Sequence, residues 1–369
     1  MKNILVWMKK ESVLVIAGAA ALLSVIWVPP DRAYSGYINW PVLILLFCLM
    51  AVVAGFREAG VLSWLSRRAS GTARDTRSLC RLLVLLCFFS SMLVTNDVAL
   101  LTFVPFAVLT LASAGHTELL IGTVVFQTIA ANLGSMLTPV GNPQNLFLFS
   151  YYRMGMGSFF RVTVPLTLLA LALLLAACQL IPRRPLQKGD RGNAEAIQLR
   201  KALLSGAGFL LSLLAVFRVL PEVLVLLGVL ALVLVTDWKI LGKVDYSLLL
   251  TFLFFFVFVG NLARIPAVSS LLQDWMQGRE MLVSVLASQV LSNVPAAALL
   301  APFTTEGAAL VAGTNIGGLG TLIASMASLI SYKIYGAFSE ADRKRYLLTF
   351  TTWNLAFLAV LLAAAFLLV

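Results

Sequence analysis

Residues 93–101 read LVTNDVALL, and residues 290–298 read VLSNVPAAA. Each stretch lies within a long apolar segment and carries a polar tip centred on asparagine, Thr95-Asn96-Asp97 in the first and Ser292-Asn293 in the second. The apolar arms beside the first tip are about 16 residues each, and a full membrane span needs ~20. We therefore expect two re-entrant helical hairpins, at residues 79–112 and 281–303, with their tips at mid-membrane depth.

A second pair of polar interruptions follows the hairpins. The first reads TPVGNPQN at residues 138–145, and the second reads TNIGG at residues 314–318 and runs on to Ala324-Ser325-Met326. Proline and glycine stop a continuous helix in the first, whereas the second has no proline, so we expect a milder break there. Non-helical polar backbone at membrane depth survives only when it is buried in protein or lines a cavity. The sequence thus predicts broken transmembrane helices at residues 118–152 and 308–332.

The composition is that of an all-α polytopic membrane protein. Apolar residues make up 60% of the chain and charged residues 12%, whereas a soluble domain is about a quarter charged. We expect about nine full spans in addition to the two hairpins. The net charge of +11 gathers in short loops, which favours the positive-inside pattern and contacts with membrane lipids over nucleic acid. A first span after Lys9-Lys10 then places the N-terminus in the cytoplasm and the C-terminus outside.

The two halves of the chain match each other. Thr95-Asn96 corresponds to Ser292-Asn293 at an offset of 197, and Asn132-Leu133-Gly134 corresponds to Asn315-Ile316-Gly317 at an offset of 183. We expect a first repeat at residues 1–181, a cytoplasmic linker at 182–201, and an extra span with the second repeat at 202–369. Because the extra span adds one crossing, the repeats are inverted, an architecture that supports alternating access around a shared site.

The tips and breaks are the candidate binding site. A helix start presents free N–H groups and a helix end presents free carbonyls, so a hairpin tip offers ligands to an anion and to a cation at one depth. The alternative is that these residues only cap buried helix ends. The candidate substrate-binding residues are Thr95, Asn96, Ser292, Asn293, Asn142, Pro143, Thr314 and Asn315.

Asp97 is the carboxylate with long apolar arms on both sides. A charge at that depth is costly and usually functional, so we expect Asp97 to bind Na⁺ or to carry a coupled proton. The alternative is an aspartate that caps the hairpin tip. The candidate coupling-ion residues are Asp97, Asn96, Thr138, Gly141, Asn293, Ala324 and Ser325. Gln127, Thr128 and Asn132 either face the cavity or make interhelical hydrogen bonds.

The sequence offers little for other chemistry. Cys48, Cys80, Cys87 and Cys178 lack metal-ligand spacing, and His116 is the only histidine. No Gly-x-Ser-x-Gly or His-Glu-x-x-His motif is present. We therefore expect no enzyme activity, no cofactor, and no metal other than Na⁺ at the hairpin tips.

These motifs resemble the ion transporter superfamily, which includes citrate-transporter-like permeases, divalent anion:sodium symporters, arsenite permeases and NhaD-type sodium/proton antiporters. The first hairpin tip is similar to the arsenite-permease motif, and Thr138-Pro139-Val140-Gly141-Asn142-Pro143 is similar to the Thr-Pro-x-Gly-x-Pro loop of the symporters. The resemblance implies a transport domain that moves against a scaffold in a homodimer. It also implies substrate between the tips and a cation beside each tip.

Three transport functions follow as expectations. The first is Na⁺- or H⁺-coupled transport of a small anion such as citrate, a dicarboxylate or an inorganic oxyanion. The second is export of neutral arsenite or antimonite, which needs no basic residue at the tips. The third is Na⁺/H⁺ antiport with Asp97 as the shared site. The resemblance also implies the cell membrane of a bacterial type.

Overall fold

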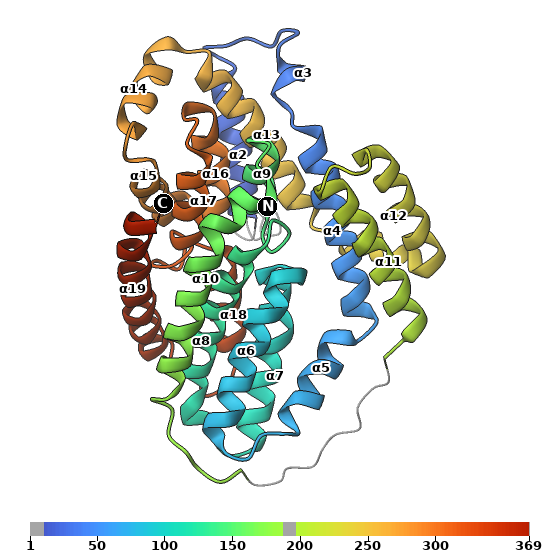
Figure 1. Cartoon of the computed structure of the whole chain (residues 1–369), viewed down its shortest axis with the longest axis vertical. Helices are drawn as coiled ribbons and strands as arrows, with labels where there is room; N and C mark the ends of the chain where they lie inside the picture. The colour runs from blue at the N-terminus through green and yellow to red at the C-terminus, as the bar shows by residue number, and fades with distance from the viewer. Residues whose placement is uncertain (1–10, 187–196, 369) are drawn as a thin grey trace, which may run out of the picture.

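The computed structural model describes residues 11–186 and 197–368, and within these residues helices are joined by turns and loops and no strand longer than one isolated bridge is present (Figure 1). The first half contains α2 (Ser12–Ser24), α3 (Tyr34–Tyr37), α4 (Trp40–Glu58), α5 (Val61–Ser70), α6 (Thr76–Val94), α7 (Asn96–Ser113), η1 (Thr117–Leu119), α8 (Leu120–Gly134), η2 (Ser135–Leu137), α9 (Pro143–Tyr151) and α10 (Met156–Cys178). The second half contains α11 (Leu199–Val216), α12 (Glu222–Asp237), η3 (Trp238–Lys243), α13 (Tyr246–Ala263), α14 (Pro266–Met276), α15 (Glu280–Leu291), α16 (Asn293–Leu300), η4 (Ala301–Phe303), α17 (Gly307–Ile316), α18 (Met326–Gly336) and α19 (Arg343–Leu368). The predicted all-α class is confirmed.

Nine helical segments of the described chain are long and apolar enough to cross a membrane. They include both arms of the first hairpin, which are 19 and 18 residues long. The arms are thus longer than the sequence suggested, because Asp75 and Ser78 form a capping box that starts α6 three residues before the apolar run. α2 is shorter than a full span, and Lys9-Lys10 and half of the linker, residues 187–196, lie outside the described residues.

The two hairpins lie in opposite halves of the molecule, as inverted repeats require (Figure 1). The first hairpin, α6 and α7, packs against α8, and the second, α15 and α16, packs against α17. Each hairpin also reaches the other broken helix, because α7 packs against α18 and α16 packs against α9. The two hairpins and the two broken helices therefore pack together as one helical unit.

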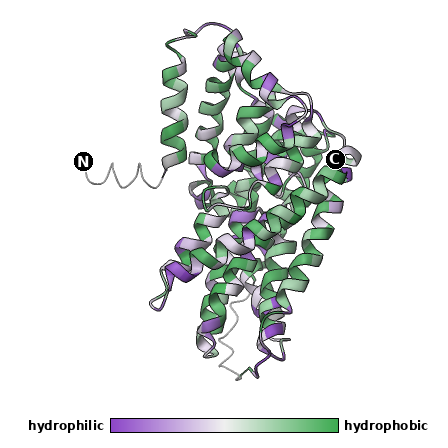
Figure 2. Ribbon diagram, turned by 90° about the vertical axis from the view of Figure 1, so that its left-hand side faces the viewer, coloured by the Kyte–Doolittle hydropathy of each residue, from purple (hydrophilic) through white to green (hydrophobic). Residues whose placement is uncertain are grey.

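A second group of helices lies beside this unit. α4 packs against α11 and α12, and α2 packs against α13. Most helices are coloured hydrophobic over much of their length in Figure 2. The helices α11 and α12 leave several leucines more than half exposed, which suits contact with lipid. These exposed leucines are Leu203, Leu210, Leu224, Leu227 and Leu234.

The helix breaks occur where the sequence predicts them, but their lengths do not follow the prediction. The first break covers residues 138–142 and the second covers residues 317–325, so the expectation of a milder second break is wrong. Gly320 explains the difference, because its φ of +104° takes the backbone out of any helix without help from proline. Glycine thus does in the second repeat what proline does in the first.

Candidate functional site

Each hairpin tip contains one residue with a strained backbone conformation. Thr95 has φ 69° and ψ 150°, and Ser292 has φ 77° and ψ 152°. This region of backbone space is essentially restricted to glycine, and a residue with a side chain held there costs about 1–3 kcal/mol. Strain of this kind persists where the surrounding structure enforces it, and it clusters at ligand clamps. The matching angles show that the two tips have the same construction.

The asparagine after each strained residue is the first residue of the helix that follows and bonds the next backbone N–H. Asn96 Oδ1 accepts a hydrogen bond of 3.0 Å from the Asp97 backbone N–H, and Asn293 Oδ1 accepts one of 3.0 Å from the Val294 N–H. Thr95 and Ser292 hold the N-cap positions of these helices, and neither makes a side-chain capping bond. The Asn96 amide nitrogen is used differently, because it donates to Asn132 Oδ1 at 3.1 Å. One side chain thus bonds the start of α7 and reaches across to α8.

The two broken helices are tied to each other by reciprocal bonds at their breaks. Asn142 begins α9 as its N-cap and donates to Asn315 Oδ1 of α17 at 3.1 Å. Ser325 begins α18 as its N-cap and donates to Asn132 Oδ1 of α8 at 3.0 Å. In each case the residue that starts the second half-helix of one repeat bonds the asparagine that ends the first half-helix of the other.

These bonds connect the two hairpin tips. The Asn293 N–H donates to the Ala324 carbonyl at 2.9 Å, and the next residue, Ser325, bonds Asn132. Asn132 also accepts from Asn96 at the first tip, so a short chain of hydrogen bonds runs from one tip to the other. Asn96 and Asn293 are 5% and 4% exposed. The structure thus brings the asparagines of both predicted tips into one buried polar cluster.

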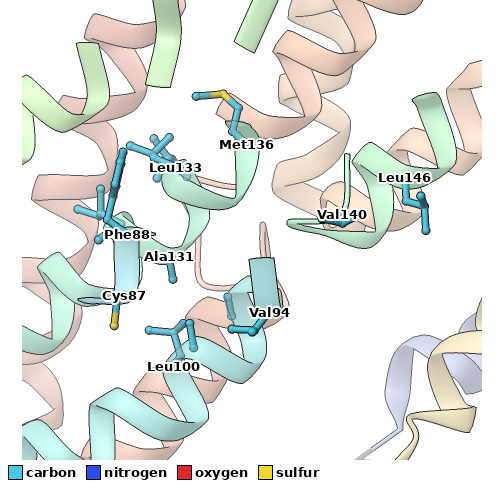
Figure 3. Packing of buried hydrophobic residues seen from close by; sticks show 14 of the residues in the cluster. Cys87, Phe88, Val94, Leu100, Ala131, Leu133, Met136, Val140 and Leu146 are labelled. Carbon is cyan, nitrogen blue, oxygen red and sulfur yellow. The ribbon is translucent and has the colours of Figure 1, made fainter. Parts of the chain in front are cut away.

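Apolar side chains enclose this cluster. Figure 3 shows Phe88, Val94, Leu100, Leu133 and Met136 around the end of α8 and the first tip. The backbone approach is close enough to require glycine, since a Cβ on Gly134 would lie 2.1 Å from the Phe88 carbonyl oxygen. Gly317 lies equally close to the second hairpin, since a Cβ added to Gly317 would be 2.8 Å from Ser288 Oγ. Hydrogen bonds in such a dry setting are strong.

Gly134→Ala tests this close contact. The added methyl group has no room, so we expect a loss of stability of about 1–3 kcal/mol or more. Gly122→Ala is the matched control in the same helix, because its added Cβ meets nothing within 4 Å; helix propensity favours that change by up to about 1 kcal/mol. Thermal unfolding in detergent measures both variants. Equal unfolding temperatures for the two would contradict the packing.

Asp97 lies in the first turn of α7, where the helix dipole favours a negative charge. Its Oδ1 atom is buried and has no hydrogen-bond partner within the described structure. No lysine or arginine pairs with it among the described ion pairs. Since a buried, unsatisfied carboxylate oxygen is costly, this atom has the chemistry of a site for a proton or a small cation.

The other predicted residues have varied surroundings. Thr138 donates its hydroxyl to the Met92 carbonyl of the first hairpin, and Pro143 occupies the first turn of α9. Gly141 lies against the Ser135 backbone, where an added Cβ would come 2.2 Å from the carbonyl oxygen. Thr314 bonds the Leu310 carbonyl of its own helix at 2.7 Å and takes no part in the links between repeats.

Gln127, Thr128 and Asn132 of α8 all bond groups outside their own helix. Gln127 donates to the Phe103 carbonyl of α7 at 3.2 Å, and Thr128 donates to Ser331 of α18 at 2.7 Å, so both make interhelical bonds. Asn132 belongs to the polar cluster, and its Nδ2 donates to the Gly318 carbonyl at 3.4 Å.

Sequence reasoning missed Gln289, Asn145 and Ser135. Gln289 Nε2 donates to the carbonyls of Gly317 and Leu319 at 2.9 and 3.0 Å. Asn145 accepts from Asn315 at 2.6 Å, and Ser135 accepts from Asn142 at 3.1 Å. A signal for Gln289 was present, because the repeat offset of 197 sets this polar residue against the apolar Met92.

The chain belongs to the citrate transporter family, whose model matches residues 4–312. An uncharacterized transporter of Methanocaldococcus jannaschii is 33% identical over 302 residues, which cover 80% of this chain and 81% of that protein. The inner membrane protein YbiR of Escherichia coli is 29% identical, with 82% of each chain covered. A silicon efflux transporter of Oryza sativa is 32% identical over 151 residues, which cover 41% of this chain and 30% of that protein.

The crystal structure of the YdaH transporter of Alcanivorax borkumensis shares the fold. Its TM-score is 0.61 at 12% identity, with 94% of this chain and 87% of that chain covered. The protein is therefore an integral membrane transporter of the ion transporter type, and the predictions of family and of a non-enzymatic role are confirmed.

Proposed function

We propose that this protein is a secondary active transporter that moves a small anion by alternating access, coupled to Na⁺ or H⁺ at Asp97. The observation that carries the proposal is the hydrogen-bonded connection of the two hairpin tips through Asn132, Ser325 and Ala324. A site shared by two inverted repeats is reached from either side of the membrane when one part rocks against the other. We further propose that the protein lies in the cell membrane with its N-terminus in the cytoplasm.

The anion would be bound mainly by helix ends. The helices α7, α9, α16 and α18 all begin at the tips and breaks, and helix N-termini favour negative charge. The asparagine amides add donors. A carboxylate such as citrate or a dicarboxylate suits these groups, and the family description supports this class. A cation at Asp97 would add charge stabilisation and so couple the two fluxes.

A second candidate function is export of a neutral oxyacid such as arsenite or antimonite. The specific support is that the tips and breaks hold no lysine or arginine at residues 95–97, 138–145, 292–294 and 317–325. A site made of amides, hydroxyls and carbonyls is well matched to an uncharged hydroxylated solute. The silicon efflux transporter among the relatives supports this candidate through its name.

Uptake into proteoliposomes tests the proposal. Labelled citrate, succinate and arsenite are offered in separate samples under an imposed Na⁺ gradient or an imposed pH gradient. We expect one carboxylate to accumulate under one of the gradients. Accumulation of arsenite alone would favour the second candidate, and no movement of any solute under either gradient would contradict the coupling.

A further inference from the structure

The two hairpins share a backbone arrangement, and two of the side-chain differences between them bear on ion binding. Within each break, a threonine hydroxyl donates to a hairpin carbonyl: Thr138 to Met92 in the first repeat, and Thr321 to Gln289 at 3.0 Å in the second. Met92 and Gln289 are separated by the same offset of 197 as the tips. At the same offset, Val294 takes the place of Asp97. The second repeat thus gains an amide and lacks the carboxylate.

The Gln289 amide lies among carbonyl oxygens of the second break. Its Nε2 atom is 2.9 Å from the Gly317 oxygen, 3.0 Å from the Leu319 oxygen and 3.2 Å from the Val285 oxygen. Its Oε1 atom accepts from the Thr321 N–H at 2.9 Å. The fit is close, since a Cβ on Gly320 would lie 2.3 Å from Oε1. Every polar atom of this side chain is therefore in use.

Carbonyl oxygens that converge at the end of a broken helix are typical ligands of a coupling cation. Here a neutral NH₂ group supplies the positive partial charge that such oxygens need. No carboxylate adds charge at the tip, because Val294 is apolar. The cation beside each tip that the family resemblance implies therefore does not fit at these carbonyls of the second repeat.

The first repeat differs at its tip. Met92 has no donor group, and the carbonyls at the first break are met by another amide, because Asn145 Nδ2 donates to those of Met136 and Thr138 at 3.2 and 3.3 Å. Asp97 supplies a carboxylate oxygen that is buried and unpartnered. An amide therefore meets the break carbonyls in both repeats, and the difference is the Asp97 carboxylate, which leaves an oxygen for an ion in the first repeat.

We propose that the coupling ion binds in the first repeat alone, one per transport cycle, and that the Gln289 amide takes the place of an ion in the second repeat. This inference rests on the proposed function and deepens it, because it fixes the number of coupled ions. Gln289 is a positioning residue here, since it shapes the second break through the carbonyls of Gly317 and Leu319.

The test counts coupled ions per substrate in proteoliposomes, from the ion gradient that just balances a set substrate gradient. Wild type is expected to give one ion per substrate, and Asp97→Asn is expected to give none. A wild-type ratio of two, or a ratio of one that survives Asp97→Asn, overturns the inference while the proposed function stands. An absence of all gradient-driven uptake contradicts the proposed function itself.

A second measurement is independent of transport. In Gln289→Glu, a carboxylate faces the carbonyl oxygens, and a bound cation would relieve the repulsion. Purified Gln289→Glu protein is expected to bind one more radioactive sodium ion per chain than wild type. Gln273→Glu is the matched control, because Gln273 is exposed on α14 and is expected to leave the number unchanged. An equal number for wild type and Gln289→Glu would overturn the role given to the amide.

Discussion

Asp97→Asn is expected to abolish accumulation of substrate against its gradient while leaving downhill movement. A carrier that couples one ion to one substrate converts a hundredfold ion gradient into a substrate gradient of about a hundredfold, equivalent to about 2.7 kcal/mol. Asparagine keeps the size and shape of the side chain but binds neither a proton nor a cation. The accumulation ratio should therefore fall to about one, because the link between the two fluxes is lost.

The fold should survive this substitution. The Asp97 Oδ1 atom makes no hydrogen bond, and the bond from Asn96 Oδ1 goes to the backbone N–H of Asp97 and not to its side chain. Removal of a buried, unpaired charge stabilises a protein or leaves it unchanged. Proteoliposome accumulation and counterflow measure the two properties separately. Glu118→Gln is the control, since Glu118 is an exposed carboxylate paired with Arg184 at 2.8 Å. Accumulation by Asp97→Asn at the wild-type ratio would remove Asp97 from the coupling step.

The hairpins and breaks were predictable because their signals are local. An asparagine tip between apolar arms, and a cluster of proline and glycine in an apolar segment, interrupt a helix whatever surrounds them. Local rules also explain the errors. The first arm of this hairpin is longer than predicted because the cap at Asp75 extends α6 through the polar residues Thr76, Arg77 and Ser78. The second break is longer because Gly320 adopts a positive φ, which the absence of proline does not reveal.

The hydrogen-bond partners within the site were not predictable from one sequence. Asn315 and Thr314 are neighbours of similar polarity, yet Asn315 bonds Asn142 and Asn145 across the repeats while Thr314 bonds its own helix. The choice depends on which face of α17 meets α9, and that is a property of tertiary packing. Gln289 was missed for the same reason, because its carbonyl partners lie 28 and 30 residues further along the chain.

Asn132→Leu is expected to have the second large effect, a loss of transport together with a loss of stability. Leucine has a similar size but makes no hydrogen bond, so Asn96, Ser325 and the Gly318 carbonyl each lose a partner in a buried setting. Each unsatisfied group costs about 1–3 kcal/mol. The first tip also loses its link to the second break, and with it the connection to the second tip.

Two comparisons separate this role from simple packing. Thr314→Val removes a buried hydroxyl that bonds only its own helix, so it should cost no more than about 1 kcal/mol and keep transport. A double-mutant cycle between Asn132→Ala and Ser325→Ala, measured by thermal unfolding, should give an interaction energy of about 0.5–3 kcal/mol. If the two effects were simply additive, the bond between α8 and the start of α18 would not stabilise the site. An interaction energy in this range would mean that the break of each repeat is stabilised by a residue of the other repeat. A movement of one hairpin tip would then change the position of the other.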